Sequence, residues 1–136
     1  MALSRRKRLE YWNTSGDRKM KEWKPIFIEN SRIPAILSKL APINIRAISL
    51  GFFVFSRDTM SETTKRHETI HFQQQLEMLI IFQWLFYFIF WFYGFCKFKN
   101  GRKAYFNIPF EKEAYQNELN IDYLKCRPRF AWLKYI

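Results

Sequence analysis

Hydrophobic and polar residues are distributed unevenly along this chain of 136 residues. Residues 1–24 are polar and basic, whereas Leu79 to Cys96 form an apolar run of 18 residues that only Gln83 and Gly94 interrupt. The basic start is followed by no apolar segment, so we expect no secretory signal there. The pattern predicts a mobile or peripheral arm over 1–24 and a single membrane-associated domain over 25–136.

Two short elements are predicted before the apolar run. Prolines separate short apolar pieces between residues 24 and 42, which favours a short helix over Ala35–Leu40 between extended segments. Ile43–Arg57 is rich in β-branched and aromatic residues around Gly51. This second stretch therefore predicts a bent strand or a tight hairpin.

A helix is predicted to start near Met60 and to continue into the apolar run. Thr59 as N-cap with Glu62 three residues later fits a capping box, and Ser61 is the alternative N-cap. Another helix is predicted from Asn107 to Lys125. The expected fold is mainly α with a short β-strand or hairpin.

The first of these helices contains the only two histidines of the chain, His67 and His71. Residues four apart lie on one face of a helix, so both imidazoles can point at one zinc ion. Glu68, beside them, is placed to accept a proton from an attacking water molecule. The alternative is a pair of ordinary solvated or core histidines.

A catalytic zinc ion normally has three protein ligands, and no third histidine exists. The third ligand must therefore be a carboxylate or a thiolate. Glu111, Glu113 and Glu118 are the candidates on the following helix.

The motif HETIHFQQ followed by EKEA resembles the zinc peptidases whose third ligand is a downstream glutamate, the gluzincins. Within them it is most similar to the integral-membrane CAAX-prenyl-protease type and to small HExxH domains with a QQ pair. The resemblance implies Glu111 as the third ligand, because Ala114 matches the alanine of the E-x-x-A-D motif. The chain departs from that motif at Tyr115, which replaces an aspartate that orients a ligand histidine. Glu118 or Asn117 is the candidate substitute.

The resemblance covers about Ile43 to Lys125. It implies that the strand before the metal helix pairs with an extended peptide substrate, although an ordinary core strand is an equal alternative. Tyr115 or Tyr105 is the candidate that would stabilise an oxyanion. Gln74 and Gln75 are expected to be polar caps only.

Charge and composition indicate an anionic partner. The formal net charge is +11 and 20% of the residues are aromatic, which together favour anionic lipid headgroups. The chain has no recognised nucleic-acid motif, so we expect no nucleic-acid partner. Cys96 and Cys126 are expected to be unpaired thiols. We expect membrane association on the cytoplasmic face of the inner membrane.

The need to bring Glu111 back to the histidines limits how the apolar run is folded. One straight helix from His71 to Phe98 would carry the chain about 40 Å away, and the residues left could return at most about 45 Å. We therefore expect the helix to turn within the apolar region, as a re-entrant or interfacial hairpin. A full span, or packing of the run against protein, is the alternative.

Together these features predict a membrane-associated, zinc-dependent peptidase-like protein that would cleave membrane-proximal peptides. The alternative is a non-catalytic, membrane-bound assembly or interaction factor that retains a metal site. Besides lipid, its partners would be a peptide substrate or a membrane protein.

Overall fold

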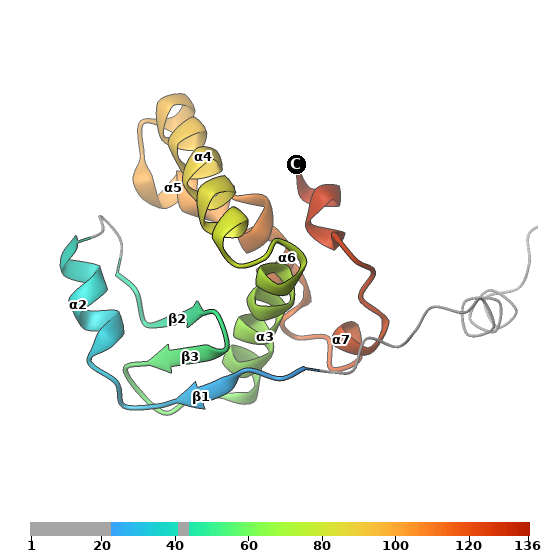
Figure 1. The fold of residues 1–136 in the computed structure, drawn as a ribbon. Coiled ribbons are helices and arrows are strands. Elements are labelled where there is room, and N and C mark those ends of the chain that lie inside the picture. Colours follow the sequence, from blue (N-terminus) through green and yellow to red (C-terminus); the bar gives the residue numbers. More distant parts are fainter. Residues whose placement is uncertain (1–22, 41–43) are drawn as a thin grey trace, which may run out of the picture.

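The computed structural model describes residues 23–40 and 44–136. The predicted basic arm, residues 1–24, lies outside them except for its last two residues. The fold is mainly α with a small sheet, as the sequence predicts (Figure 1). In chain order the elements are β1 (Ile26–Ile28), α2 (Ile33–Leu40), β2 (Ala47–Leu50), β3 (Phe53–Ser56), α3 (Glu62–Glu77), α4 (Ile81–Phe98), α5 (Gly101–Phe106), α6 (Pro109–Asn117), α7 (Tyr123–Cys126) and the 3₁₀ helix η1 (Ala131–Tyr135).

The sheet has the strand order β1-β3-β2. β2 and β3 form an antiparallel hairpin, one of the two alternatives predicted for Ile43–Arg57, and Gly51 takes the positive φ of 61° that its turn requires. β1 pairs in parallel with β3, a pairing that no local pattern predicts. Helix α2 covers the predicted Ala35–Leu40 and starts earlier, at Ile33, with Pro34 in its first turn.

Helix α3 begins with Ser61 as its N-cap, whose hydroxyl accepts a hydrogen bond from the Thr64 amide at 3.1 Å. The expectation of Thr59 as N-cap is therefore wrong. The capping-box pattern was present, but the alternative cap two residues later forms the first turn.

The chain turns between α3 and α4 instead of continuing as one straight helix. Leu79 and Ile80 both take positive φ values, 52° and 62°, and α4 then runs without interruption to Phe98. The expected turn thus falls on the first two residues of the apolar run and not in its interior. α4 is long and apolar enough to cross a membrane.

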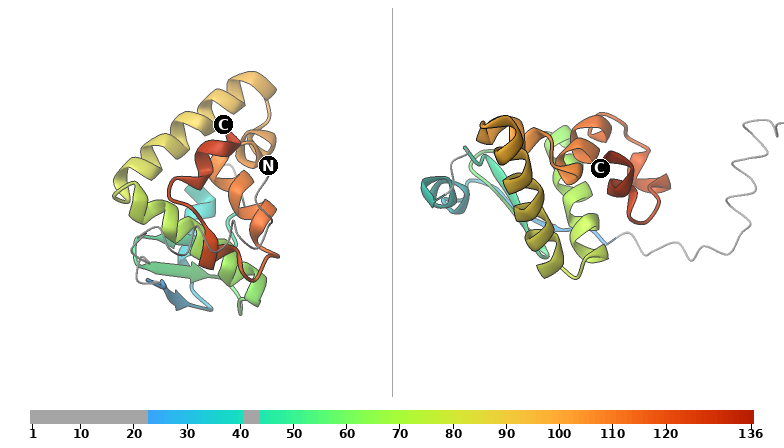
Figure 2. Two further views of the ribbon diagram at one scale, coloured as in Figure 1. Left: turned by 90° about the vertical axis from the view of Figure 1, so that its right-hand side faces the viewer. Right: turned by 90° about the horizontal axis from the view of Figure 1, so that it is seen from above.

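After α4 the chain turns back through a short helix, α5, which the sequence did not predict. Lys99 takes a left-handed conformation, and α5 then packs back along α4 (Figures 1 and 2). Gly94 permits the close approach, because a Cβ there would lie 3.0 Å from the Cα of Ala104. This hairpin of helices brings the chain back to the end of α3.

The predicted helix from Asn107 to Lys125 is wrong in its extent. Ile108 is the N-cap of α6, Pro109 occupies the first turn, and the helix ends at Asn117. A straight helix would carry Arg127 about 21 Å from Glu113, whereas the observed turn lets Arg127 form an ion pair with it. The core between α4, α6 and η1 contains Met78, Ile108, Phe110 and Trp132.

Candidate metal centre

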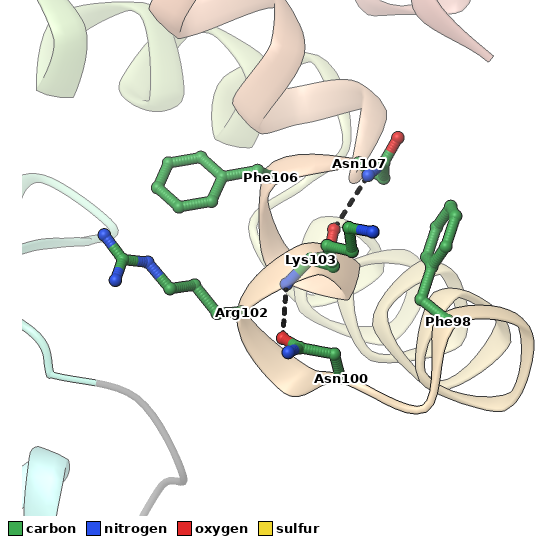
Figure 3. A pocket seen from close by; sticks show the side chains of 6 residues that line it. All are labelled: Phe98, Asn100, Arg102, Lys103, Phe106 and Asn107. Carbon is green, nitrogen blue, oxygen red and sulfur yellow. Dashed lines mark hydrogen bonds between the residues drawn. The ribbon is translucent and has the colours of Figure 1, made fainter.

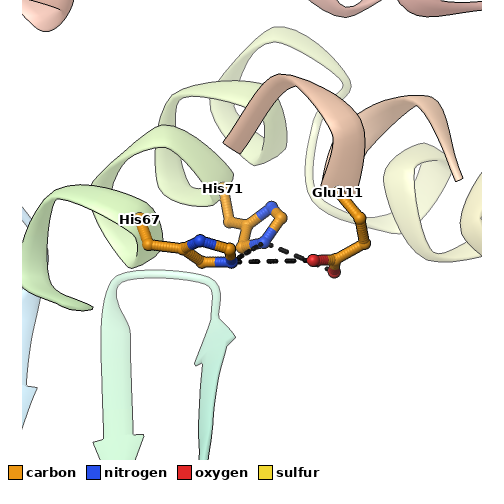
Figure 4. Close-up of side chains that lie close together, drawn as sticks. All are labelled: His67, His71 and Glu111. Carbon is orange, nitrogen blue, oxygen red and sulfur yellow. Dashed lines mark hydrogen bonds and ion pairs between the residues drawn. The ribbon is translucent and has the colours of Figure 1, made fainter. Parts of the chain in front are cut away.

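Three side chains from two helices meet in the interior. His67 and His71 project from α3 and Glu111 projects from the first turn of α6 (Figure 4). The two Nε2 atoms lie 3.1 Å apart, and Glu111 oxygens lie 3.6 Å from Nε2 of His67 and 3.4 Å from Nε2 of His71. Ligand atoms held about 2.0–2.1 Å from a tetrahedral zinc ion would be about 3.3 Å apart. The three residues are therefore close enough to hold a metal ion.

The hydrogen bonds on the far side of each imidazole favour this use of the rings. Nδ1 of His67 donates to Oε2 of Glu118 at 2.7 Å, and Nδ1 of His71 donates to Oε1 of Gln74 at 2.9 Å. With both protons on Nδ1, both Nε2 lone pairs face the same point. Facing lone pairs repel unless a cation or a proton lies between them, so the arrangement fits a metal ion.

The carboxylate of Glu111 also has the surroundings expected of a metal ligand. It is 3% exposed, and among the described residues its Oε2 is a buried oxygen with no hydrogen-bond partner. Burial would raise its pKa, but the neighbouring His71 and His67 outweigh burial and hold that pKa below its ordinary value. A buried, ionised and partly unpaired oxygen is expected of a metal ligand.

The histidines lower the pKa of Glu111, and the neighbouring carboxylates in turn raise the pKa of His71. Burial lowers its pKa, but Glu111, Glu68 and the hydrogen bond with Gln74 together raise it to about 9. In the metal-free chain a proton thus occupies the place between the ring and the Glu111 carboxylate.

Glu68 follows His67 on α3 and is 6% exposed. Burial raises the pKa of its carboxyl group, while His71 and His67 partly offset this. A carboxylate with a raised pKa, beside both imidazoles, is better suited to accepting a proton than an ordinary surface glutamate.

Sequence reasoning missed two residues that α4 contributes. Tyr87 donates its hydroxyl hydrogen to Oε1 of Glu111 at 3.1 Å, and Nε2 of Gln83 donates to Oε1 of Gln74 at 3.3 Å. Their spacing of four in an otherwise apolar helix was the available signal, because it places both polar groups on one face. The apolar helix is thus part of the wall of the metal centre.

The two tyrosines named from the sequence lie at the same centre. The ring of Tyr115 packs edge-on against the ring of His67, with centroids 4.5 Å apart, and its side chain is 42% exposed. Tyr105 is the less exposed of the two. Tyr115 is therefore the phenol of this pair that a solvent-borne molecule can reach.

The other carboxylate and amide candidates have different partners. Glu113 is fully buried and pairs with Arg127, which also pairs with Glu77. Asn117 donates to the Glu113 carbonyl and to Tyr135 and does not reach a histidine. Of the two proposed substitutes for the missing aspartate, only Glu118 hydrogen-bonds a candidate ligand.

Gln74 and Gln75 are more than the polar caps expected of them. Gln74 accepts from His71 and donates to the Phe110 carbonyl and to Glu113, so it joins α3 to α6. Gln75 donates to the Ser49 carbonyl at 2.6 Å and accepts from the Gly51 amide at 2.7 Å. It therefore fixes the edge of β2 to the helix that carries the histidines.

Comparison of the chain with protein-family models, curated proteins and solved structures gives no match in any of the three. The geometry of the centre is therefore what supports a function.

Proposed function

We propose that this protein is a membrane-associated, zinc-dependent peptidase-like hydrolase, in which His67, His71 and Glu111 hold the metal. The observation that carries the proposal is the convergence of three donor atoms whose far sides are already occupied by hydrogen bonds. Two imidazole nitrogens and one carboxylate oxygen are a donor set that zinc prefers, and they leave a fourth position for reactants. When bound, zinc would polarise a peptide carbonyl and make a water molecule more acidic.

The protein's own groups supply the remaining chemistry in this proposal. Glu68 accepts the proton of the attacking water and passes it to the leaving amine, a role that its raised pKa favours. Tyr115, partly exposed beside His67, donates a hydrogen bond to the developing oxyanion. The apolar exposed surface of α4 favours peptides close to a bilayer as substrates. We propose that the domain lies on the cytoplasmic face of the membrane.

One observation favours a second candidate function. The three candidate ligands are only 7%, 8% and 3% exposed, and such enclosure is more typical of a structural metal site than of a catalytic one. In that case the protein would be a membrane-bound assembly or interaction factor that the metal stabilises.

The substitution Glu68→Gln separates the two candidates. In a hydrolase it abolishes cleavage of peptides in membrane-mimetic samples and leaves one zinc ion per chain. Glu62→Gln, on the exposed first turn of the same helix, is the matched control and retains cleavage. Full zinc content with no cleavage by the wild type under any condition, and no effect of Glu68→Gln on the biological role, would support the second candidate.

A further inference from the structure

The outer surface of α4 is apolar over most of its circumference. Its inner stripe contains Gln83, Tyr87 and Gly94, which face the rest of the domain. Phe90 and Trp91 pack against the core. Ten further apolar side chains of the helix are between 37% and 76% exposed. They are Ile81, Phe82, Trp84, Leu85, Phe86, Phe88, Ile89, Phe92, Tyr93 and Phe95. Soluble monomers rarely expose so large a continuous apolar patch, so a non-aqueous environment must cover it.

The charge distribution identifies that environment. Residues 78–110 contain no acidic residue, and their four basic residues are all at the turn between α4 and α5. These are Lys97, Lys99, Arg102 and Lys103, all exposed. Arg102 and Lys103 line a hollow of about 370 Å³, together with Phe98 and Phe106 (Figure 3). Apolar residues next to basic ones complement the hydrocarbon and the phosphates of an anionic bilayer.

The contacts of α4 with the metal centre determine how it can lie in that bilayer. Tyr87 is about 9 Å along the axis from Ile81 and about 15 Å from Lys97, and it is hydrogen-bonded to Glu111. If α4 crossed the hydrocarbon, which is about 30 Å thick, Glu111 would lie roughly 10 Å inside it. Glu113, on the same helix α6, and its buried ion pair with Arg127 would follow. Charged groups at that depth are costly, which argues against a span.

We propose that α4 lies in the plane of the membrane, within one leaflet of an anionic bilayer. Its outer face contacts the hydrocarbon, and the four basic residues at the α4–α5 turn contact lipid phosphates. The metal centre, on the inner face, is thereby held about one helix diameter, roughly 10 Å, above the hydrocarbon. The proposal rests on the membrane association proposed above and specifies its geometry and its lipid chemistry.

Depth measurements along one stripe of α4 test the orientation. Phe82, Ile89 and Cys96 are exposed and are spaced seven residues apart, so they share nearly the same face. Three variants with one cysteine each are labelled with a nitroxide, and all three contain Cys126→Ser. The first keeps native Cys96, and the other two contain Cys96→Ser with either Phe82→Cys or Ile89→Cys. The full-length chain is bound to vesicles of phosphatidylcholine with phosphatidylglycerol. Oxygen and nickel-chelate accessibilities then give the depth of each label.

An in-plane helix gives three depths within a few ångströms of one another, all in one leaflet. A spanning helix gives depths that change by about 10 Å from one label to the next, and that result would overturn the proposal. Three labels that stay equally accessible to the aqueous nickel chelate would also overturn it, since the outer face would then lie in water. Three labels shielded from both oxygen and the chelate would overturn it as well, since protein or a second copy would then cover the face.

Lipid chemistry is tested by charge removal. The variant Lys97→Gln, Lys99→Gln, Arg102→Gln and Lys103→Gln should bind vesicles containing phosphatidylglycerol at least about tenfold more weakly. Its binding to pure phosphatidylcholine should be unchanged. The control removes four exposed charges elsewhere, at Lys24, Lys39, Arg46 and Arg129, and should lose less. Equal losses in the two variants would contradict a headgroup site at the turn.

Zinc content measured on the same samples keeps the two proposals distinguishable. One zinc per chain with graded depths refutes the in-plane helix and leaves the metal centre intact. Equal depths with no zinc refute the metal centre and leave the membrane orientation intact.

Discussion

Oε2 of Glu118 lies 2.7 Å from Nδ1 of His67 and accepts its hydrogen bond. Glu118 is the C-cap residue of α6, seven residues after Glu111, so one short helix provides both a candidate ligand and the partner that orients another. Glu118 would thus take the orienting role that the interpretation of the sequence expected of an aspartate at the position of Tyr115.

Removing this orienting carboxylate should weaken metal binding. Glu118→Ala leaves Nδ1 of His67 without its acceptor, and we expect zinc affinity to fall by about 10–100-fold. Glu118→Gln keeps an oxygen acceptor and should lose less. Competition with a chromophoric chelator measures both, and equal losses in the two variants would contradict the orienting role.

The hydroxyl of Tyr87 should matter to the metal centre although α4 carries no ligand. Tyr87→Phe removes the hydrogen bond to Glu111, and we expect zinc affinity to fall about tenfold with little loss of stability. Tyr93→Phe removes the same hydroxyl from an exposed position of the same helix and serves as the control. Unchanged affinity in Tyr87→Phe would show that the contact with Glu111 is incidental.

Zinc binding should release a proton from His71. Its pKa of about 9 in the metal-free chain means that the ring is largely protonated at pH 8, whereas an ordinary histidine with a pKa of about 6.5 would not be. Calorimetry in buffers of different ionisation enthalpy should therefore detect close to one proton released per zinc at pH 8. Release near zero would contradict the raised pKa.

The same raised pKa makes the stability of the metal-free chain depend on pH. Protonated His71 contributes fully below about pH 6.5, the pKa in an unfolded chain, and this contribution is lost as the pH rises through 9. Urea unfolding of metal-free protein should show falling stability over that range. Replacement of His71 by Gln should flatten the fall.

A buried ion cluster beside the centre should dominate stability. The side chains of Arg127, Glu77 and Glu113 are 4%, 3% and 0% exposed. Arg127→Met leaves two buried carboxylates without their cation and should cost about 3–5 kcal/mol of unfolding free energy. Arg129→Met, at an exposed position two residues away, should change it little. Equal unfolding free energies of the two variants would show that the cluster is not a determinant of the fold.

The local signals in the sequence were sufficient for helix α2 and for the two histidines on one helical face, and they narrowed the segment around Gly51 to a bent strand or a hairpin. They were sufficient because turn residues and helical spacing act within a few residues. The turn at Leu79 and Ile80 could not be predicted from local signals, since neither residue is a typical helix terminator. It was inferred only from the distance that Glu111 must return, and its position followed from packing.

Long-range contacts account for the rest of what the sequence did not predict. β1 pairs with β3 across more than twenty residues. α6 ends early because the chain must bring Arg127 back to Glu113. Tyr87 is one of ten aromatic residues in the apolar run, and the sequence alone does not show which of them contacts Glu111.

X-ray absorption at the zinc edge, on purified full-length protein loaded with one equivalent of zinc, reports the metal ligands themselves. We predict one bound zinc ion with two imidazole nitrogens and a carboxylate oxygen at about 2.0–2.2 Å and no sulfur. The imidazole signal should be lost in His67→Ala. Sulfur neighbours at about 2.3 Å, or zinc retained equally by His67→Ala, would contradict a centre built from His67, His71 and Glu111.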